Sequence, residues 1–126
     1  MAYQPKTNKD IRCPLECGME VFGGKWKTRV ICVLYVKQPL RFNELKRELV
    51  NITDTVLNST LKELIGYGIV SRHSYDTQPP HVDYRLTELG ESTIPVLTAI
   101  HNWADTNLSK RSDTDKPFCQ DCNSAK

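Results

Sequence analysis

The first apolar pattern along the chain predicts a helix that begins at Pro14. Leu15, Met19 and Phe22 recur at the spacing that places side chains on one face of a helix. Proline is favoured at the first position of a helix, because the N–H group that it lacks has no partner there. A glycine pair at 23–24 ends the pattern. The beginning of the chain therefore predicts one short amphipathic helix.

Two further helices are predicted before residue 50. Residues 25–36 carry apolar side chains around most of the helix, Cys32 among them, which predicts nearly complete burial. Pro39 stops this helix, since proline disfavours helical geometry in the residue before it. Residues 41–49 form a short amphipathic pattern with its apolar residues on one side. We expect these two helices to pack against each other through their apolar faces.

The next predicted helix has two chemically different sides. Thr53 can cap its first free N–H groups, and the pattern runs to about Tyr67. The inner side carries the apolar residues Leu57, Leu61, Leu64 and Ile65. The outer side carries the polar residues Thr55, Asn58, Ser59 and Lys62. This outer set is suited to hydrogen bonds with base edges and phosphates, and it is equally typical of a solvated helix face.

The order of the following elements favours the first of these alternatives. Residues 69–76 and 82–86 have β-like patterns, and the proline-rich segment 77–81 between them cannot continue a strand. A hairpin directly after a helix pair is the arrangement of a winged helix-turn-helix, in which the second helix enters the major groove of DNA. A last helix is predicted over 88–108, and Pro95 should kink or split it. The fold class is thus mainly α with a small β-hairpin wing.

Length and composition fit one compact domain. The chain has 126 residues, of which 39% are hydrophobic and 25% are charged. We expect a polar arm over 1–12, the winged-helix domain over 13–109 and a polar tail over 110–126. The longest apolar stretch, 30–36, is far shorter than the ~20 residues of a membrane span, and we expect a cytoplasmic protein without membrane contact.

The distribution of charge is consistent with a nucleic-acid partner. Residues 22–86 hold ten basic and six acidic side chains, whereas residues 87–126 hold four basic and six acidic ones. A basic middle with a more acidic end suits a protein that presents one face to a polyanion. The sequence contains no nucleophile elbow, no P-loop and no HExxH motif, so we expect neither an enzyme nor a cofactor.

Together these elements make the chain resemble the HxlR family of winged-helix bacterial transcription regulators, which is related in fold to the MarR group. The resemblance covers Cys13 to Trp103. The residues that carry it are Cys13-Pro14, Gly23-Gly24-Lys25-Trp26, Arg41-Phe42-Asn43-Glu44-Leu45, Leu61-Lys62-Glu63-Leu64, Gly68-Ile69-Val70 with Arg72, Pro79-Pro80, and Tyr84-Arg85-Leu86-Thr87-Glu88-Leu89-Gly90.

The resemblance implies a homodimer joined through the N- and C-terminal helices. It also implies a double-stranded, pseudo-palindromic DNA operator that receives one recognition helix per half-site, and repression more often than activation. Two positions depart from the family pattern, because Thr55 and His81 stand where relatives usually carry basic residues. Two fewer cations per subunit should weaken the attraction to phosphates and flatten its dependence on salt.

Candidate DNA-binding residues follow from the helix faces and the strand positions. Base contacts are predicted for Thr55, Asn58, Ser59 and Lys62. Contacts to the DNA backbone or the minor groove are predicted for Lys25, Lys27, Arg41, Arg72, His81 and Arg85. Two of these have a structural alternative, since Arg41 could cap or pair near Glu44 and Arg85 could pair with Glu88.

Three of the five cysteines lie within the predicted domain. Cys13 stands at a helix start, where free N–H groups and the positive end of the dipole stabilise a thiolate. It is therefore a redox-sensing candidate, with Cys17 as a core residue or a resolving thiol. The resemblance agrees, because some family members are thiol switches for oxidants and electrophiles. The alternative for Cys13 is an inert cysteine at a dimer interface, and Cys32 is expected to be part of the core.

The remaining two cysteines, Cys119 and Cys122, form a CxxC pair in the polar tail. They permit a second class of function, a thiol-redox or zinc-binding module, and together with Cys13 and Cys17 they could supply four thiolates to one Zn²⁺. A third alternative is a winged-helix interaction module that no longer binds DNA. The inducing signal and the operator sequence do not follow from the sequence.

Overall fold

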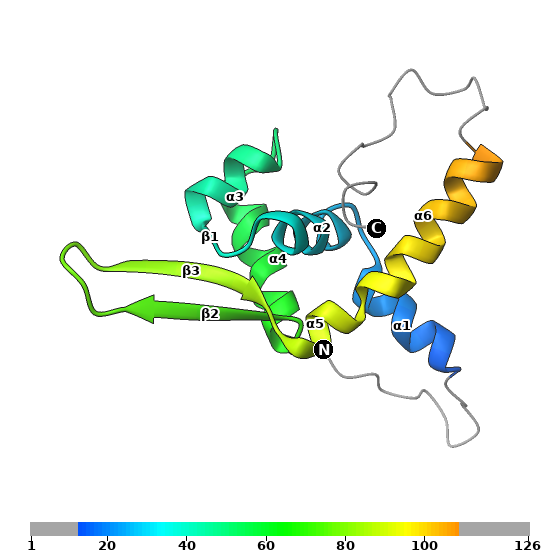
Figure 1. Ribbon diagram of the computed structural model, residues 1–126, viewed down its shortest axis with the longest axis horizontal. Coiled ribbons are helices and arrows are strands. Elements are labelled where there is room, and N and C mark those ends of the chain that lie inside the picture. The colour runs from blue at the N-terminus through cyan, green and yellow to red at the C-terminus, as the bar shows by residue number, and fades with distance from the viewer. Residues whose placement is uncertain (1–12, 109–126) are drawn as a thin grey trace.

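A computed structural model describes residues 13–108, and the predicted arm, tail and CxxC pair lie outside this range (Figure 1). Its elements in chain order are α1 (Pro14–Phe22), α2 (Lys27–Lys37), β1 (Leu40–Arg41), α3 (Phe42–Glu48), α4 (Asp54–Gly66), β2 (Val70–Tyr75), β3 (His81–Leu86), α5 (Glu88–Ser92) and α6 (Ile94–Leu108). The helix, helix, hairpin order predicted from the sequence is confirmed. No helix in the described range is long and apolar enough to cross a membrane.

The strands form a small antiparallel sheet in the order β1-β3-β2. Tyr75 faces His81 next to the turn of the hairpin, and Val70 faces Leu86 at its base. Strand β1 was not predicted, because two residues are too few to show an alternating pattern. It adds an edge to β3 by pairing Leu40 with Tyr84. The hairpin extends away from the helices, as the wing of a winged helix does (Figure 1).

The core forms around α2. Its residues Val30, Ile31 and Leu34 are fully buried, and they pack with apolar side chains of the other helices and of the sheet. The other buried apolar residues are Leu40, Leu45, Leu49, Ile52, Leu57, Leu61, Leu64, Ile69, Val70, Tyr84, Leu86 and Ile94. Cys32 is half-buried and thus lies at the margin of the core, while Ile65, predicted to face inward, is exposed.

The last predicted helix is split, as Pro95 indicated. Thr93 forms the end of α5, and α6 begins at Ile94. The side chain of Thr87 caps α5 by accepting a hydrogen bond from Gly90 N at 2.9 Å. The split allows α6 to leave the winged part in a new direction.

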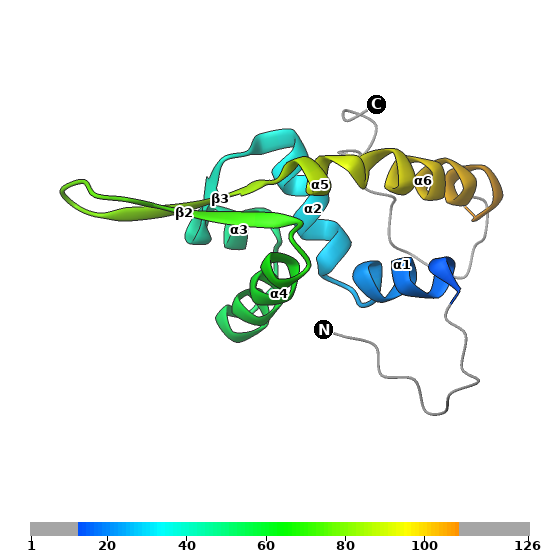
Figure 2. The same ribbon diagram turned by 90° about the horizontal axis from the view of Figure 1, so that it is seen from below.

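Helices α1 and α6 project together from the end of the molecule opposite to the hairpin (Figure 2). No residue of α1 is buried, and in α6 only Ile94 is. Several apolar side chains of both helices are therefore exposed, among them Leu15 at 71% and Trp103 at 61%, whereas Val21, Phe22 and Leu97 pack partly against the core. Most of each apolar stripe lies outside the core of this chain.

Gly90 is the position where the fold tolerates no side chain. A Cβ atom there would collide with the backbone carbonyl of Ile69, which cannot move without displacing the base of the wing. We expect Gly90→Ala to lower the free energy of unfolding by at least about 2 kcal/mol, measured by urea denaturation.

Gly66→Ala is the matched control, because a Cβ at Gly66 in α4 would meet nothing within 4 Å. Alanine should leave the stability unchanged or raise it by up to about 1 kcal/mol, since glycine is a poor helix former. Equal stability of the two variants would contradict the close packing at Gly90.

Candidate nucleic-acid interface

Helices α3 and α4 form the helix-turn-helix. The turn between them contains Asn51, whose φ of 75° is unusual for a residue other than glycine, and the buried Ile52, which anchors the turn in the core. Lys46 Nζ of α3 lies 2.7 Å from Asp54 Oδ1 in the first turn of α4. This ion pair offsets the negative charge of Asp54 at the N-terminal end of α4, a charge that would repel a phosphate.

The two sides of α4 differ as the sequence predicted. Thr53 Oγ1 accepts a hydrogen bond from Val56 N at 3.2 Å and so caps the helix. Leu57, Leu61 and Leu64 are buried beneath it. The four predicted base-contacting residues are all exposed, namely Thr55, Asn58, Ser59 and Lys62. Helix α4 lies at the edge of the molecule, beside the base of the hairpin (Figure 2), so this polar side faces outward.

Two arginines lie on the wing, the exposed Arg72 and the half-buried Arg85, and each is oriented by a neighbour. The Arg72 guanidinium donates a hydrogen bond to Ser74 Oγ at 3.2 Å. Arg85 donates to the hydroxyl of Tyr75 at 2.8 Å and lies 3.5 Å from the carboxylate of Asp83. The alternative pairing of Arg85 with Glu88 is not found among the described residues, where the Arg85 guanidinium is engaged by Tyr75 of β2 and Asp83 of β3.

His81 lies at the start of β3, where it packs against the wing itself. Its ring stacks on that of Tyr75, with 4.4 Å between the centroids and 18° between the planes. Its Nδ1 lies 3.3 Å from Thr77 Oγ1. The stack holds the ring of His81 against the hairpin, so this candidate DNA contact has a structural role in the wing.

Arg41 and Lys25 remain candidates for backbone contacts. The backbone N–H of Arg41 donates to Glu44 Oε1 at 2.8 Å. The predicted capping contact near Glu44 is therefore present, and it involves only the backbone of Arg41. Its side chain is exposed and forms no ion pair within residues 13–108. Lys25 Nζ lies 4.8 Å from the centroid of the Trp26 ring at the start of α2.

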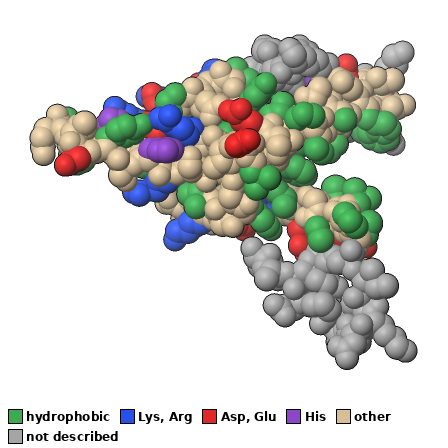
Figure 3. Space-filling view, turned by 60° about the horizontal axis from the view of Figure 1, so that its bottom comes forward, with side chains coloured by type: hydrophobic (Ala, Val, Ile, Leu, Met, Phe, Trp, Pro, Cys, Tyr) green, Lys and Arg blue, Asp and Glu red, His purple; other side chains and the backbone are tan. Residues whose placement is uncertain are grey.

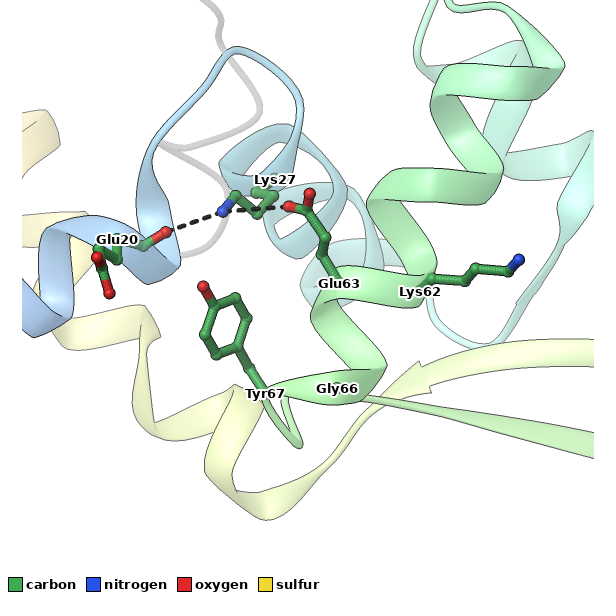
Figure 4. Close-up of a pocket in the computed structure, with 6 residues that line it drawn as sticks. All are labelled: Glu20, Lys27, Lys62, Glu63, Gly66 and Tyr67. Atoms are coloured by element: carbon green, nitrogen blue, oxygen red, sulfur yellow. Dashed lines mark hydrogen bonds and ion pairs between the residues drawn. The ribbon is translucent and has the colours of Figure 1, made fainter. Parts of the chain in front are cut away.

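Lys27 is removed from the phosphate-binding set. Only 13% of its side chain is exposed, and its amine donates to Glu20 O at 2.9 Å and lies 3.3 Å from Glu63 Oε2 (Figure 4). The amine is thus held inside the protein, beside a cavity of about 240 Å³ lined by Glu20, Lys27, Lys62, Glu63, Gly66 and Tyr67. Lys62 points away from this cluster (Figure 4).

Cys13 and Cys17 are exposed free thiols in the first turn of α1. The backbone joins them through a hydrogen bond from Cys17 N to Cys13 O of 3.2 Å, and no side chain caps the helix. Within residues 13–108, no group of three or more His, Cys, Asp or Glu residues could hold a metal ion. The proposed four-thiolate site also needs Cys119 and Cys122, which lie outside the described residues.

The surface separates two kinds of side chains. In Figure 3, Lys, Arg and His side chains gather over the half of the molecule that carries the hairpin, and hydrophobic side chains gather over the opposite end, where α1 and α6 lie. An exposed polar helix beside a hairpin that carries Arg72 and Arg85 is the geometry with which a winged helix-turn-helix contacts DNA. A family model described as HxlR-like helix-turn-helix matches residues 21–112. The chain belongs to the HxlR family.

Curated members of this family support the same conclusion. The helix-turn-helix transcription regulator YkvN of Bacillus subtilis is 46% identical over 95 residues, which are 75% of this chain and 80% of YkvN. A regulator of Methanothermobacter thermautotrophicus is 43% identical over 91 residues, which are 72% of this chain and 69% of the relative. These proteins are named as transcription regulators and not as enzymes.

Solved structures show the same fold. The reduced form of YodB from Bacillus subtilis is 31% identical, with a TM-score of 0.73, and the match covers 81% of this chain and all of YodB. The redox regulator HypR in its oxidized form is 38% identical, with a TM-score of 0.68, and the match covers 75% of this chain and 97% of HypR. The protein is thus a DNA-binding transcription regulator of the HxlR family.

The structure adds residues that the sequence patterns did not reveal. Tyr75 orients Arg85 and stacks on His81, and Lys46 neutralises the acidic start of α4. Strand alternation alone could have found Tyr75, because it lies directly opposite His81 in a hairpin paired around 77–80. The Lys46 contact depends on the turn between two helices and had no signal in the sequence.

Proposed function

We propose that the protein is a homodimeric repressor that binds a palindromic operator, with α4 of each subunit in the major groove. The exposed row of Thr55, Asn58, Ser59 and Lys62 on α4 carries this proposal, because these side chains offer donors and acceptors to base edges. The wing would lie along the DNA backbone, where Arg72 and Arg85 contact phosphates.

Sequence preference and electrostatic attraction come from different parts of this surface. Asn58 can form paired hydrogen bonds to an adenine, whereas Arg72, Arg85, Arg41 and Lys25 supply positive charge. Because Lys27 is held internally, fewer cations reach the phosphates than the sequence suggested. We therefore propose that base contacts and DNA shape provide more of the specificity than charge does.

In vitro selection from a random DNA pool should yield a palindromic motif for the reduced protein. Asn58→Ala should then lose discrimination at one position of each half-site, by about tenfold. Arg72→Ala should weaken binding to all sequences alike and reduce the slope of log K against log salt by about one per subunit.

Lys37→Met is the control for a lost surface charge, since Lys37 is paired with Glu48 at 2.7 Å, at the junction of α2 and α3. It should leave both the motif and the slope unchanged. A pool without any enriched motif at low salt would contradict DNA recognition and favour the interaction module.

The dimer is proposed from the faces of α1 and α6. Both helices expose apolar side chains on the same end of the molecule (Figure 3). The exposed apolar residues are Leu15, Met19, Val96, Ile100 and Trp103. A contiguous apolar surface of this kind marks an interaction site, and a second copy of the chain offers a surface of matching chemistry.

Trp103→Asp should convert the dimer into a monomer at micromolar concentration, measured by sedimentation equilibrium. A charge in the centre of an apolar interface would be desolvated without a partner. Val50→Asp is the control, because Val50 is also an exposed apolar residue, at 67%, but belongs to the turn between α3 and α4. A dimer that survives Trp103→Asp would contradict this interface.

Cys13 is proposed as the redox-sensing thiol. It is an exposed free thiol at the N-terminal end of α1, open to an oxidant in solution, and α1 belongs to the proposed dimer surface. Hypochlorite oxidises a thiolate to a sulfenic acid and is itself reduced to chloride. A polar oxidised group at this place would alter the packing of α1 in the dimer, and thereby the affinity for the operator.

Treatment with one equivalent of hypochlorite should lower operator affinity at least about tenfold, and Cys13→Ser should abolish this response. Cys17→Ser is the matched control, because Cys17 is an exposed thiol one helical turn away. We expect it to respond as the unmodified protein does. An unchanged response of Cys13→Ser, read by gel shift and by mass spectrometry of the thiols, would contradict the assignment.

A further inference from the structure

One amine joins three parts of the structure. Lys27 Nζ donates a hydrogen bond to the backbone oxygen of Glu20 in α1 and lies 3.3 Å from the Glu63 carboxylate in α4 (Figure 4). It also lies 5.4 Å from the ring centroid of Tyr67, which follows α4. Its side chain is 13% exposed. Helices α1 and α4 therefore both contact a single charged group.

Core packing fixes only one end of α1. Val21 and Phe22, in its last turn, are partly buried against the core. No residue of α1 is fully buried. The link to α2 is a glycine pair, and Gly24 has a φ of 89° that other residues rarely adopt. The cavity of about 240 Å³ separates the end of α1 from the last turn of α4. The apolar contacts thus hold only the C-terminal end of α1. The angle between α1 and α4 then depends on the polar contact of Lys27.

Loss of this contact affects the angle of α1 more than the stability of the core. The amine of Lys27 is mostly buried, with two oxygen partners and an aromatic face, and removal of its charge breaks the links to the Glu63 carboxylate and the Glu20 carbonyl. Glu63 itself is exposed to water at 59% and can turn outward once the amine is gone. The preferred angle between α1 and α4 would then be lost without a loss of the core.

We propose that Lys27 is a positioning residue that sets the separation of the two operator half-sites. This inference rests on the homodimer proposed above. If α1 and α6 form the dimer surface, the angle between α1 and α4 determines how far apart the two recognition helices lie. Half-site separation is a geometric property of such a dimer, because each base pair added between the half-sites shifts and rotates one site relative to the other.

The test uses operators that share the selected half-site and differ by single base pairs in the central spacer. Full-length protein should prefer one spacer over its neighbours by about tenfold, and Lys27→Met should reduce this preference to less than about threefold. Lys27→Arg keeps the charge and several donors and should retain the preference. Glu63→Gln keeps the shape of the side chain but removes the charge of the pair, and we expect an intermediate preference.

Three controls separate positioning from other roles. Lys37→Met removes a surface ion pair of α2 at the opposite end of that helix and should keep the original spacer preference. The thermal midpoint and the dimer dissociation constant of Lys27→Met should remain close to those of the unmodified protein. The slope of log K against log salt should also remain unchanged, since a positioning residue releases no counterion.

The inference is overturned if Lys27→Met keeps the original spacer preference. It is also overturned if this variant weakens binding equally at every spacing and lowers the salt slope by about one, which would indicate a phosphate contact. If Lys27→Met does not fold, Glu63→Gln decides on the same criteria. A wild-type dimer that binds the motif without any spacer preference overturns the inference alone, whereas a monomer or the lack of a motif overturns the proposed function with it.

Discussion

The structure depends on the burial of α2. This helix is covered by α4, the sheet and α6, and its three fully buried residues hold these elements in one core. Because the core is small, each surrounding element has only one apolar side to contribute, and its other side faces solvent. The polar side of α4 and the open face of the wing are consequences of this arrangement. The surface that we propose to recognise DNA is thus the outer side of the elements that bury α2.

The same constraint explains why α1 and α6 leave apolar residues exposed in a single chain. The elements of the winged part and the beginning of α6 cover α2, so most apolar residues of α1 and of the rest of α6 stay outside the core. Their stripes are as regular as that of α4, yet Leu15 and Trp103 remain exposed whereas Leu57 is fully buried. An apolar stripe indicates that a helix needs a partner, but it does not indicate whether the partner belongs to the same chain.

Much of the fold could be predicted from the sequence, because the strongest signals are local. The cap at Thr53, the glycine pair after α1 and the helix break at Pro95 depend on neighbouring residues. The helices and both strands of the hairpin were found close to their places, whereas the two-residue strand β1 was missed. The site was predicted less completely. Lys27 reads as a surface cation by spacing, but its amine is engaged by residues 7 and 36 positions away, Glu20 and Glu63. Long side chains can reach partners in distant segments, and helical spacing carries no information about such contacts.

The junction at the base of the wing has a consequence for how the protein can vary. The N–H of Thr87 donates to Ile69 O at 3.0 Å, its hydroxyl donates to the same oxygen at 3.2 Å, and Gly90 packs against this carbonyl group. The two legs of the hairpin are therefore joined where they leave the helices. The tip at 76–80 lies outside this closure and contributes no buried residue. Duplicated copies of the gene could diverge in the length and charge of this tip, and so come to serve different promoters, while the helices beneath remain the same.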